Sequence, residues 1–453
     1  MNNIDPAWAW SAFKPTNRQP WNLAQAAHLY RRAGFGVGRG GELQRAVAGG
    51  VQRCVKQLLH DNQEPQSFQD EMARMTRSIV ASGNLQSLAT AWLYRMLKTT
   101  DQLQEKTTLF WHGHFATSAA KVQDAFMMQQ QNDLLRKHAI GDFSEMVQAI
   151  SQNPAMLLYL DSANNRKTHP NENFARELME LFCLGEGNYT EQDIRELARC
   201  FTGWEVRNRA YRFNKYQHDF GKKTLLGAQG ELTGQQAVAH IISTPAAPLF
   251  IARKLVKYYV MDEPAASDEL LAPLAKRLRK DQFQIRGTLE IIFRSNLFYS
   301  KHSVARKIKS PVEMVVGMMR GLSIKTDLTQ VAQRLQELGH GIYFPPNVKG
   351  WDGGRTWINS STLLGRSNLM HELIHSTNTT FGNKSLQAHL QNNRIHSLAH
   401  AATYFSDLFY AVPLANNFKS QLIANAQKET NNTDQQFKSL LHQVVSIPQF
   451  QLG

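Results

Sequence analysis

Residues 170–187, PNENFARELMELFCLGEG, carry the signals that predict the fold class of this chain. Asn171 is a residue type that caps the start of a helix, and Gly185 and Gly187 are types that end one. Between them, four apolar residues recur at the spacing of one helix face. They are Phe174, Leu178, Leu181 and Phe182. The stretch therefore predicts an amphipathic helix over residues 172–184.

Apolar residues follow the same periodicity along most of the chain, so we predict a mainly α-helical fold, a multi-helical array with long ordered loops. The exception is residues 204–227, WEVRNRAYRFNKYQHDFGKKTLLG, where alternating aromatic and polar residues around a polar turn predict one inserted β-hairpin. The other expected helices cover residues 22–34, 42–60, 85–112, 120–138, 142–151, 154–162, 190–202, 232–243, 246–260, 267–280, 284–295, 310–322, 327–337 and 360–376, with more after residue 393.

The chain has 453 residues, of which 42% are hydrophobic. This length suits two or three cores. We divide it into an N-terminal helical core at 20–203, the hairpin insertion at 204–231 and a C-terminal helical part at 232–453. No window approaches the ~18–20 apolar residues of a membrane span, and the first residues lack the pattern of a secretory signal. We therefore expect a cytoplasmic protein, with a periplasmic location or export with a partner as the alternative.

Basic residues exceed acidic residues by 51 to 37, which gives a net charge of +14. This excess favours an anionic partner, and we expect an anionic polymer. Nucleic acid is the less favoured alternative, because the basic residues are scattered in short pairs and no nucleic-acid-binding motif is present. The three cysteines lack the spacing of a metal site, so we expect buried thiols.

The polar face of the helix at 172–184 supports two interpretations. Glu177 and Glu180 lie one turn apart, where two carboxylates repel each other unless a cation lies between them. As an ordinary solvated face, the helix would balance its charges through ion pairs such as Glu172 with Arg176. As a catalytic face, it would use Glu177 and Glu180 to donate and accept protons.

The segment YLDSANNRKTHP, which precedes this helix, is unusually rich in acids, amides and basic residues. Oxygen ligands from Asp161, Asn165 and Glu172 would suit Ca²⁺ or Mg²⁺. The ordinary explanation is a polar loop between two packed helices. The candidate binding residues of this region are Asn165, Lys167, Asn171, Asn173 and Arg176.

Two histidines stand close together in EKTTLFWHGHFATS, residues 105–118. His112 and His114 would point apart on one continuous helix but could converge across a helix end. We predict His112 as a metal ligand, with Zn²⁺ as a further candidate metal, and His114 as a catalytic residue. The alternative is that both histidines pack and form hydrogen bonds near a helix C-terminus, where histidine is favoured. The HExxH pattern of zinc proteases is absent.

Two polar loops supply the remaining candidate binding residues. HDFGKK, residues 218–223, predicts a tight turn in which Asp219 and Lys222 could contact a ligand. PPNVKGWDGGRTWINSS, residues 345–361, places aromatic rings beside polar groups, a combination that suits recognition of sugars or peptides. Equally, its tryptophans could hold the loop against the helices. The candidates in this second loop are Trp351, Asp352 and Arg355.

Six blocks of the sequence, in order, resemble the bacterial domain-of-unknown-function 1800 family. They are HLYRRAGFG, EKTTLFWHGHFATS, the long block from NPAMLLYLD to CFTGW, HDFGKKTLLG, KSPVEMVVG and PPNVKGWDGGRTWINSSTLLGRSN. The resemblance covers nearly the whole chain and implies one family-wide unit over residues 1–453. It also implies a co-encoded partner that looks like the sulfatase and alkaline-phosphatase fold. No reaction is assigned to the family, so the resemblance brings no catalytic residues to this sequence.

Two classes of function remain open at this point. The first is a metal-assisted hydrolase or transferase that acts on a polymer such as polysaccharide, with Ca²⁺, Mg²⁺ or Zn²⁺ as its cofactor. The second is a non-catalytic binding or assembly partner, in which the polar blocks are structural networks. Convergence of the histidines with Glu177 and Glu180 in one cleft would favour the enzyme, and full pairing with arginine and lysine would favour the binding protein.

Overall fold

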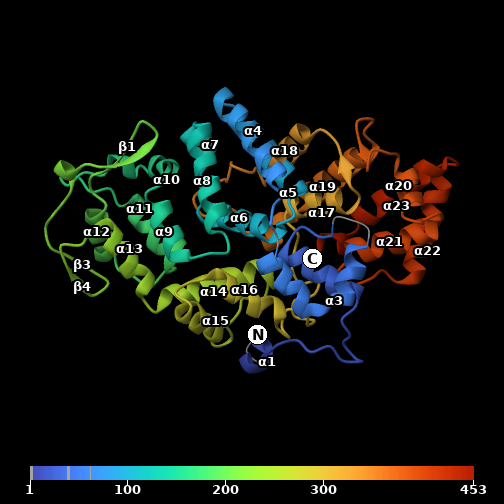
Figure 1. Cartoon of the computed structure of the whole chain (residues 1–453), viewed down its shortest axis with the longest axis horizontal. Helices are drawn as coiled ribbons and strands as arrows, with labels where there is room; N and C mark the ends of the chain where they lie inside the picture. The colour runs from blue at the N-terminus through green and yellow to red at the C-terminus, as the bar shows by residue number, and fades with distance from the viewer. Residues whose placement is uncertain (1–3, 38–40, 62) are drawn as a thin grey trace.

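Helices form nearly all of the regular structure in the computed structural model, which describes residues 4–37, 41–61 and 63–453 (Figure 1). The prediction of a mainly α-helical fold is confirmed. Buried apolar side chains from along the chain pack into one connected cluster. In Figure 1 the molecule is elongated, with the N-terminal helices near its middle and the C-terminal helices at one end.

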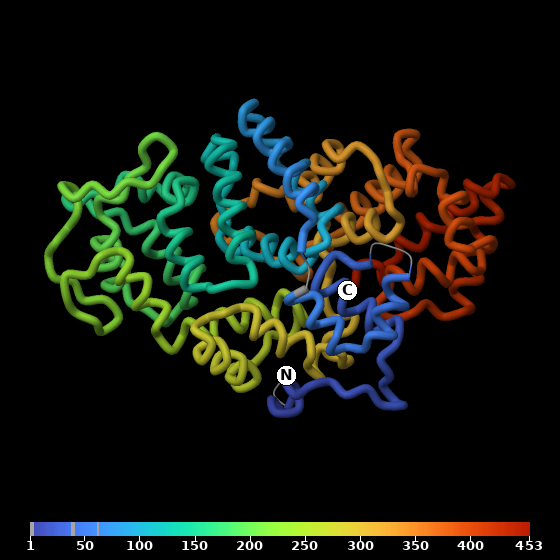
Figure 2. Tube along the Cα trace, in the orientation of Figure 1, coloured from blue at the N-terminus to red at the C-terminus, as the bar shows by residue number. Residues whose placement is uncertain are grey.

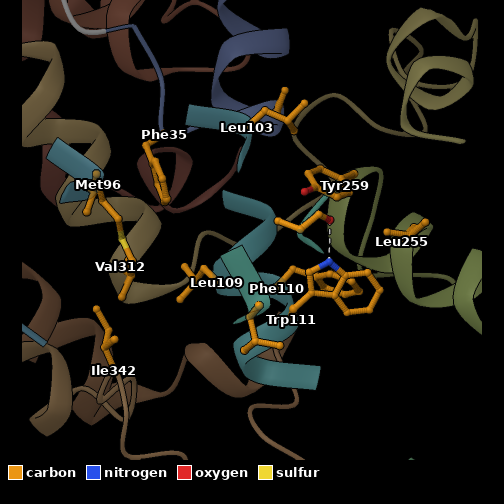
Figure 3. Close-up of a cluster of buried hydrophobic side chains, with 14 of the residues drawn as sticks. Phe35, Met96, Leu103, Leu109, Phe110, Trp111, Leu255, Tyr259, Val312 and Ile342 are labelled. Atoms are coloured by element: carbon orange, nitrogen blue, oxygen red, sulfur yellow. Dashed lines mark hydrogen bonds between the residues drawn. The ribbon is translucent and has the colours of Figure 1, made fainter. Parts of the chain in front are cut away.

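Helix α6 (Gln102–His114) lies at the centre of the buried cluster (Figure 3). Eleven of its thirteen residues are buried, so it needs neighbours on almost every side. Leu109 and Trp111 point into this cluster, together with Leu255 and Tyr259 of the helix α14 (Ala246–Tyr259). The helix begins at Asp101, whose carboxylate accepts a hydrogen bond from the N–H of Gln104.

Helices α2 (Leu23–Ala33), α5 (Leu85–Lys98), α8 (Ala125–His138) and the π-helix η1 (Gln57–Asp61) contact α6, and the other N-terminal helices lie further from it. These others are α1 (Pro6–Trp10), α3 (Glu42–Lys56), α4 (Gln66–Ser82), α7 (Ala119–Val122), α9 (Phe143–Ser151) and α10 (Pro154–Tyr159).

The next part of the chain, green in Figure 1, lies at the opposite end from the C-terminal helices and contains both β-hairpins. It consists of η2 (Ser162–Asn164), α11 (Asn173–Glu177), the π-helix η3 (Leu178–Cys183), α12 (Glu191–Cys200), β1 (Trp204–Arg207), β2 (Ala210–Phe213), η4 (Lys215–Gln217), β3 (Lys223–Leu225), β4 (Ala228–Gly230) and α13 (Gly234–Ser243). Strands β1 and β2 pair antiparallel, as do β3 and β4.

The chain then passes below α6 in Figure 1 and continues to the C-terminal end. The elements there, after α14, are α15 (Asp268–Lys280), α16 (Ile285–Arg294), α17 (Pro311–Gly321), β5 (Ile324–Lys325), α18 (Leu328–Glu337), η5 (Gly354–Trp357), α19 (Ser360–His375), β6 (Thr380–Phe381), α20 (Leu386–Asn392), α21 (Leu398–Phe409), α22 (Asn416–Glu429), α23 (Thr433–Ser446) and η6 (Pro448–Gln451). Strands β5 and β6 form the third small antiparallel pair of the described residues.

Several boundaries differ from the sequence prediction for local reasons. The helix expected over 85–112 is two helices, because Asp101 starts a new one. The helix expected over 172–184 changes from α to π at Leu178. The inserted β segment contains a second short hairpin, which turns at Leu226 and Gly227 with positive φ at both residues.

Candidate functional site

His112 is part of the packed core. Its Nε2 accepts a hydrogen bond of 3.0 Å from the backbone N–H of Tyr343, and its ring packs against Trp92 and Trp351. Burial lowers the pKa of His112 to about 3, so the ring is neutral near pH 7. The position therefore has the arrangement expected for a histidine that packs at the C-terminal end of a helix.

His114 joins α6 to the π-helical segment η3. Its Nε2 lies 3.0 Å from the carbonyl oxygen of Phe182, and since that oxygen can only accept, Nε2 donates. Burial and the nearby Lys254 cation lower the pKa of His114 to about 3. The two sequence blocks that hold the candidate histidines and carboxylates do meet here, but they meet through a backbone carbonyl.

The polar loop before α11 is organised by its own amides. The side-chain N–H₂ of Asn165 donates to the carbonyl of Ala198 at 2.8 Å, and its oxygen accepts from the N–H of Asn171 at 2.9 Å. Asn173 donates to the carbonyl of Leu160. These predicted binding residues therefore hold the backbone of the loop and the start of the helix.

Several of the other charged residues of this region form ion pairs. Asp161 accepts from Lys121 at 2.8 Å. Arg176 forms a forked pair with Glu191 at 2.7 and 2.8 Å and reaches Glu172 at 3.5 Å. The side chain of Lys167 is exposed, and no interaction of its ammonium group is found within the described part of the chain. Two of the predicted metal ligands, Asp161 and Glu172, are thus engaged by cations.

Glu177 and Glu180 differ in their environment. Glu180 accepts a hydrogen bond of 2.8 Å from the hydroxyl of Tyr189. Glu177 is half-buried and has neither a hydrogen bond nor an ion pair among the described residues. Burial and the neighbouring Glu180 raise the pKa of Glu177, and the cations of Lys349 and Arg176 oppose the shift. Of the predicted catalytic residues, Glu177 alone combines a raised pKa with an uncommitted carboxylate.

Two lysines that act on the candidate residues were not predicted. Lys349 belongs to the second polar loop, and Lys254 lies on α14 close enough to His114 to influence its pKa. Burial and the neighbouring Lys257 lower the pKa of Lys254 to about 8, while Asp352 opposes the shift. Lys254 was hard to recognise from the sequence, because it lies within an otherwise ordinary apolar helix.

The second polar loop is fixed against α6. A Cβ at Gly350, which has φ +72°, would lie 2.1 Å from the carbonyl oxygen of Gly113, so only glycine fits. Trp351 packs beside the rings of His112 and His340. The predicted binding residues in this loop also form structural contacts. The carbonyl of Asp352 accepts from Lys257 at 3.0 Å, and Arg355 pairs with Glu263 at 2.9 Å.

The HDFGKK turn is held by Arg199, whose guanidinium pairs with Asp219 at 2.7 Å and lowers the pKa of that carboxyl. The side chain of Lys222 is exposed, whereas Lys223 is buried and donates to two carbonyls of the turn. The turn is therefore a structural element, with Lys222 at its surface.

A surface that sequence reasoning did not select stands out at the end of the molecule that carries β1 (Figure 1). We call it the cationic–aromatic tip. Phe213, Tyr216 and Phe220 are 45%, 75% and 61% exposed. Their neighbours in sequence include five exposed basic residues. The tip consists of Arg207, Arg209, Arg212, Phe213, Lys215, Tyr216, Phe220 and Lys222. The signal was present as an alternation of aromatic and basic residues, which we interpreted only as strand periodicity.

Two further observations concern metal and membrane. Within residues 4–37, 41–61 and 63–453, no three side chains of histidine, cysteine, aspartate or glutamate come together in a way that could hold a metal ion. None of the helices in these ranges is both long and apolar enough to cross a membrane.

Comparison with known proteins gives one match. The model of a family described as "Protein of unknown function (DUF1800)" matches residues 28–452. This agrees with the resemblance seen in the six sequence blocks. No curated protein and no solved structure matches the chain.

Proposed function

Because this chain belongs to the DUF1800 family, whose description gives no function, we propose one from the structure: a non-catalytic binding protein that docks an anionic polysaccharide through the cationic–aromatic tip. The proposal rests on the second of the two classes left open by the sequence. Most of the candidate catalytic and metal-binding side chains form internal hydrogen bonds and ion pairs, which support the fold.

One observation carries the proposal, namely the exposure of aromatic rings at the tip. Among the described residues, the large aromatic side chains with substantial exposure are five, and three of them belong to the tip. A fourth, Phe126, packs beside the guanidinium of Arg209 at 6.0 Å. Leaving a large ring in water forgoes roughly 1.5–3 kcal/mol of burial energy, so a group of such rings marks an interaction surface.

The chemistry of the tip suits a charged sugar polymer. Ring faces pack on the apolar faces of sugars, and adjacent cations pair with carboxylate or sulfate groups of the same chain. Lys215 already lies over the ring of Tyr216 at 5.3 Å, so charge and ring are presented together. Proteins that stack successive nucleic-acid bases use a broad sheet or a groove, whereas these rings stand on a two-stranded hairpin and the turn after it.

The test measures binding of the full chain to polygalacturonate by calorimetry at two salt concentrations. The double variant Tyr216→Ala/Phe220→Ala should bind at least tenfold more weakly, since each lost stacking contact removes about 1–3 kcal/mol. The matched control is Leu364→Ala, which removes a 64% exposed apolar side chain outside the tip. Neutral dextran controls for the charge requirement.

Three outcomes would contradict the proposal. Equal polygalacturonate binding by the double variant and the wild type would remove the tip from the interaction. Tip-dependent binding of single-stranded DNA but not of the sugar polymer would favour the nucleic-acid alternative. Tip-dependent capture of a sulfatase-like or phosphatase-like protein, with no polymer binding, would favour the assembly role.

A second candidate function is acid–base chemistry at Glu177, supported by a specific observation. Its carboxylate is half-buried, has a raised pKa and lies near Glu180 and Lys349. We propose that Glu177 would move the proton in a metal-assisted hydrolase or transferase reaction, with a divalent ion held near Glu177 and Glu180.

Elemental analysis of the purified protein, before and after chelation, tests this second candidate. A stoichiometric divalent metal should be retained by Glu191→Gln and lost in Glu177→Gln and Glu180→Gln. Glu191 is the matched control because its carboxylate is held by Arg176 on the neighbouring surface. A well-folded wild type without metal after incubation with Ca²⁺, Mg²⁺ and Zn²⁺ would eliminate the metal-assisted mechanism.

A further inference from the structure

A small cavity of about 40 Å³ lies beside α2 and next to α17. Arg31 and Arg32 line it from α2, and Lys307 and Lys309 line it from the segment before α17, where Glu313 also faces it. Figure 2 shows that the N-terminal helices and the C-terminal segment lie together in this part of the molecule, and contacts between α2 and α21 agree.

Cations outnumber carboxylates around this cavity. Two side-chain carboxylates act on the cations, and each already has a lysine partner. Glu313 pairs with Lys106 at 2.6 Å, and Asp262 pairs with Lys307 at 3.2 Å. Gly453, the last residue of the sequence, also lines the cavity, next to Lys309 and Arg32. The lining cations that have no ion pair within the described part of the chain are Arg31, Arg32 and Lys309.

Most of the guanidinium nitrogens at the cavity are also without hydrogen bonds. All three side-chain nitrogens of Arg31 are buried and unpartnered, as are Nε and Nη1 of Arg32. Only Nη2 of Arg32 is engaged, by the carbonyls of Val260 and Ser303. The ammonium of Lys309 donates to two backbone carbonyls and gains no counter-charge from them.

This arrangement is unfavourable for an empty cavity. Burial and the adjacent Arg32 lower the pKa of Arg31 to about 9, and burial lowers that of Arg32 to about 10. Both values still leave the guanidinium groups charged near pH 7. A buried charge with no partner is among the least favourable features of a folded protein, and two adjacent arginines with five free N–H-bearing nitrogens require an acceptor.

We infer that this cavity is a binding site for one tetrahedral oxyanion, a phosphate or sulfate group, held by Arg31, Arg32 and Lys309. The planar guanidinium fork matches two oxygens of such a group. The space fits as well, because about 40 Å³ corresponds to roughly three waters at about 10–15 Å³ each. The site is separate from the cationic–aromatic tip, so it does not depend on the proposed polymer binding.

Thermal unfolding of the full chain in chloride buffer, with inorganic phosphate titrated at constant ionic strength, tests this inference. A saturable rise in Tm is expected, of roughly 3 °C at a 100-fold excess over Kd. Calorimetry should give one phosphate per chain. A parallel titration with phenyl phosphate distinguishes a free ion, which alone would bind, from the end group of a larger ligand, in which case both would bind.

Two variants and one control keep the test decisive. Arg31→Met should raise the Tm measured without phosphate and weaken phosphate binding at least tenfold, and Arg31→Gln serves the same purpose if the first variant does not fold. Arg176→Met, which removes a paired surface guanidinium, should leave the phosphate response unchanged. An equal phosphate response in Arg31→Met and wild type would show general salt stabilisation and overturn the inference. A crystal structure with a carboxylate of the chain itself in the cavity, either a side chain or the backbone carboxylate of Gly453, would also overturn it.

Discussion

The polar network around residues 161–223 and the cationic cavity beside α2 both concentrate charged side chains, but they resolve that charge differently. In the network, Arg176 and Arg199 each hold two carboxylates. In the cavity, Arg31 has no partner for any guanidinium nitrogen. The network was the more prominent candidate in the sequence, whereas the cavity is the region whose charges stay unpaired in the structure.

The comparison teaches that charge density in a sequence is a poor guide to a ligand site. A dense mixture of acids, amides and arginines can satisfy itself once the helices pack, as Asn165 does with two backbone partners. A group that stays unpaired after packing is stronger evidence for a ligand site, because its burial without a partner is unfavourable. Buried polar and charged groups that have no partner in the folded chain are therefore the best indicators of a ligand site.

The largest predicted effect is on stability at acid pH. Protonation of the buried histidines around α6 would place unpaired cations in the core, as in the cavity. Burial lowers the pKa values of His112, His114 and His340 to about 3. Their unfolded values are about 6.5, so the unfolded state binds more protons below that pH. Stability should fall from pH 6.5 towards pH 3, by about 1.4 kcal/mol per histidine and pH unit at most.

Denaturant unfolding at pH 7, 6 and 5 measures this slope. His114→Asn should reduce the slope by close to one proton, while a histidine at the surface, replaced in His169→Asn, should leave it unchanged. A pH-independent midpoint over this range would show that the core histidines are not held neutral.

The second effect concerns Glu313, whose side-chain carboxylate faces the cavity. Lys106 and Lys307 hold the pKa of Glu313 far below its usual range, and Glu313 also accepts from the N–H of Ser310. Glu313→Gln keeps the shape but leaves the lysines and arginines without this counter-charge. We expect a loss of about 3–5 kcal/mol, as for a buried pair that loses one partner. Added phosphate should recover part of the loss, and chemical denaturation with and without phosphate measures both.

Some features of the fold could be predicted from the sequence, because they depend on residues that are close together in the chain. The capping boxes at Ser310 with Glu313 and at Thr190 with Asp193 join residues three apart, so the sequence alone suffices to recognise them. Helix α4 was missed; it contributes one buried residue, Met72, and so lacks a wide apolar face.

The site residues depend on distant contacts, and these are not visible in a local pattern. His112 is held by Tyr343, more than two hundred residues away in the chain. Arg31 and Arg32 looked like one more scattered basic pair. Their surroundings follow from the packing of α2 against α21 and from the C-terminal segment beside the cavity, so no short motif could have revealed them.

The third effect tests whether the amides of the network are structural. Asn165→Ala removes a fully buried side chain that donates to Ala198 and accepts from Asn171. The N–H of Asn171 would lose its partner, and the carbonyl of Ala198 would keep only the bond from the N–H of Phe201. Together with the lost packing, this should destabilise the protein by about 2–3 kcal/mol. Asn164→Ala, at the exposed neighbouring position, is the control. If Asn165→Ala unfolds at the wild-type denaturant midpoint, the loop is held by something other than this side chain.

The smallest effect is the change in stability when one arginine is removed, and it should have opposite signs in the two regions. Arg199→Met breaks the pairs of this guanidinium with Asp219 and Glu196, which are partly exposed, so the protein should lose about 1–2 kcal/mol. The loss should shrink in 1 M salt, where charges separated by more than ~3 Å are screened. Arg31→Met removes a charge that has no partner, so in phosphate-free buffer the same chemical change should stabilise the protein. If both substitutions destabilise it equally, the cavity is already neutralised within the fold, and the distinction between the two regions fails.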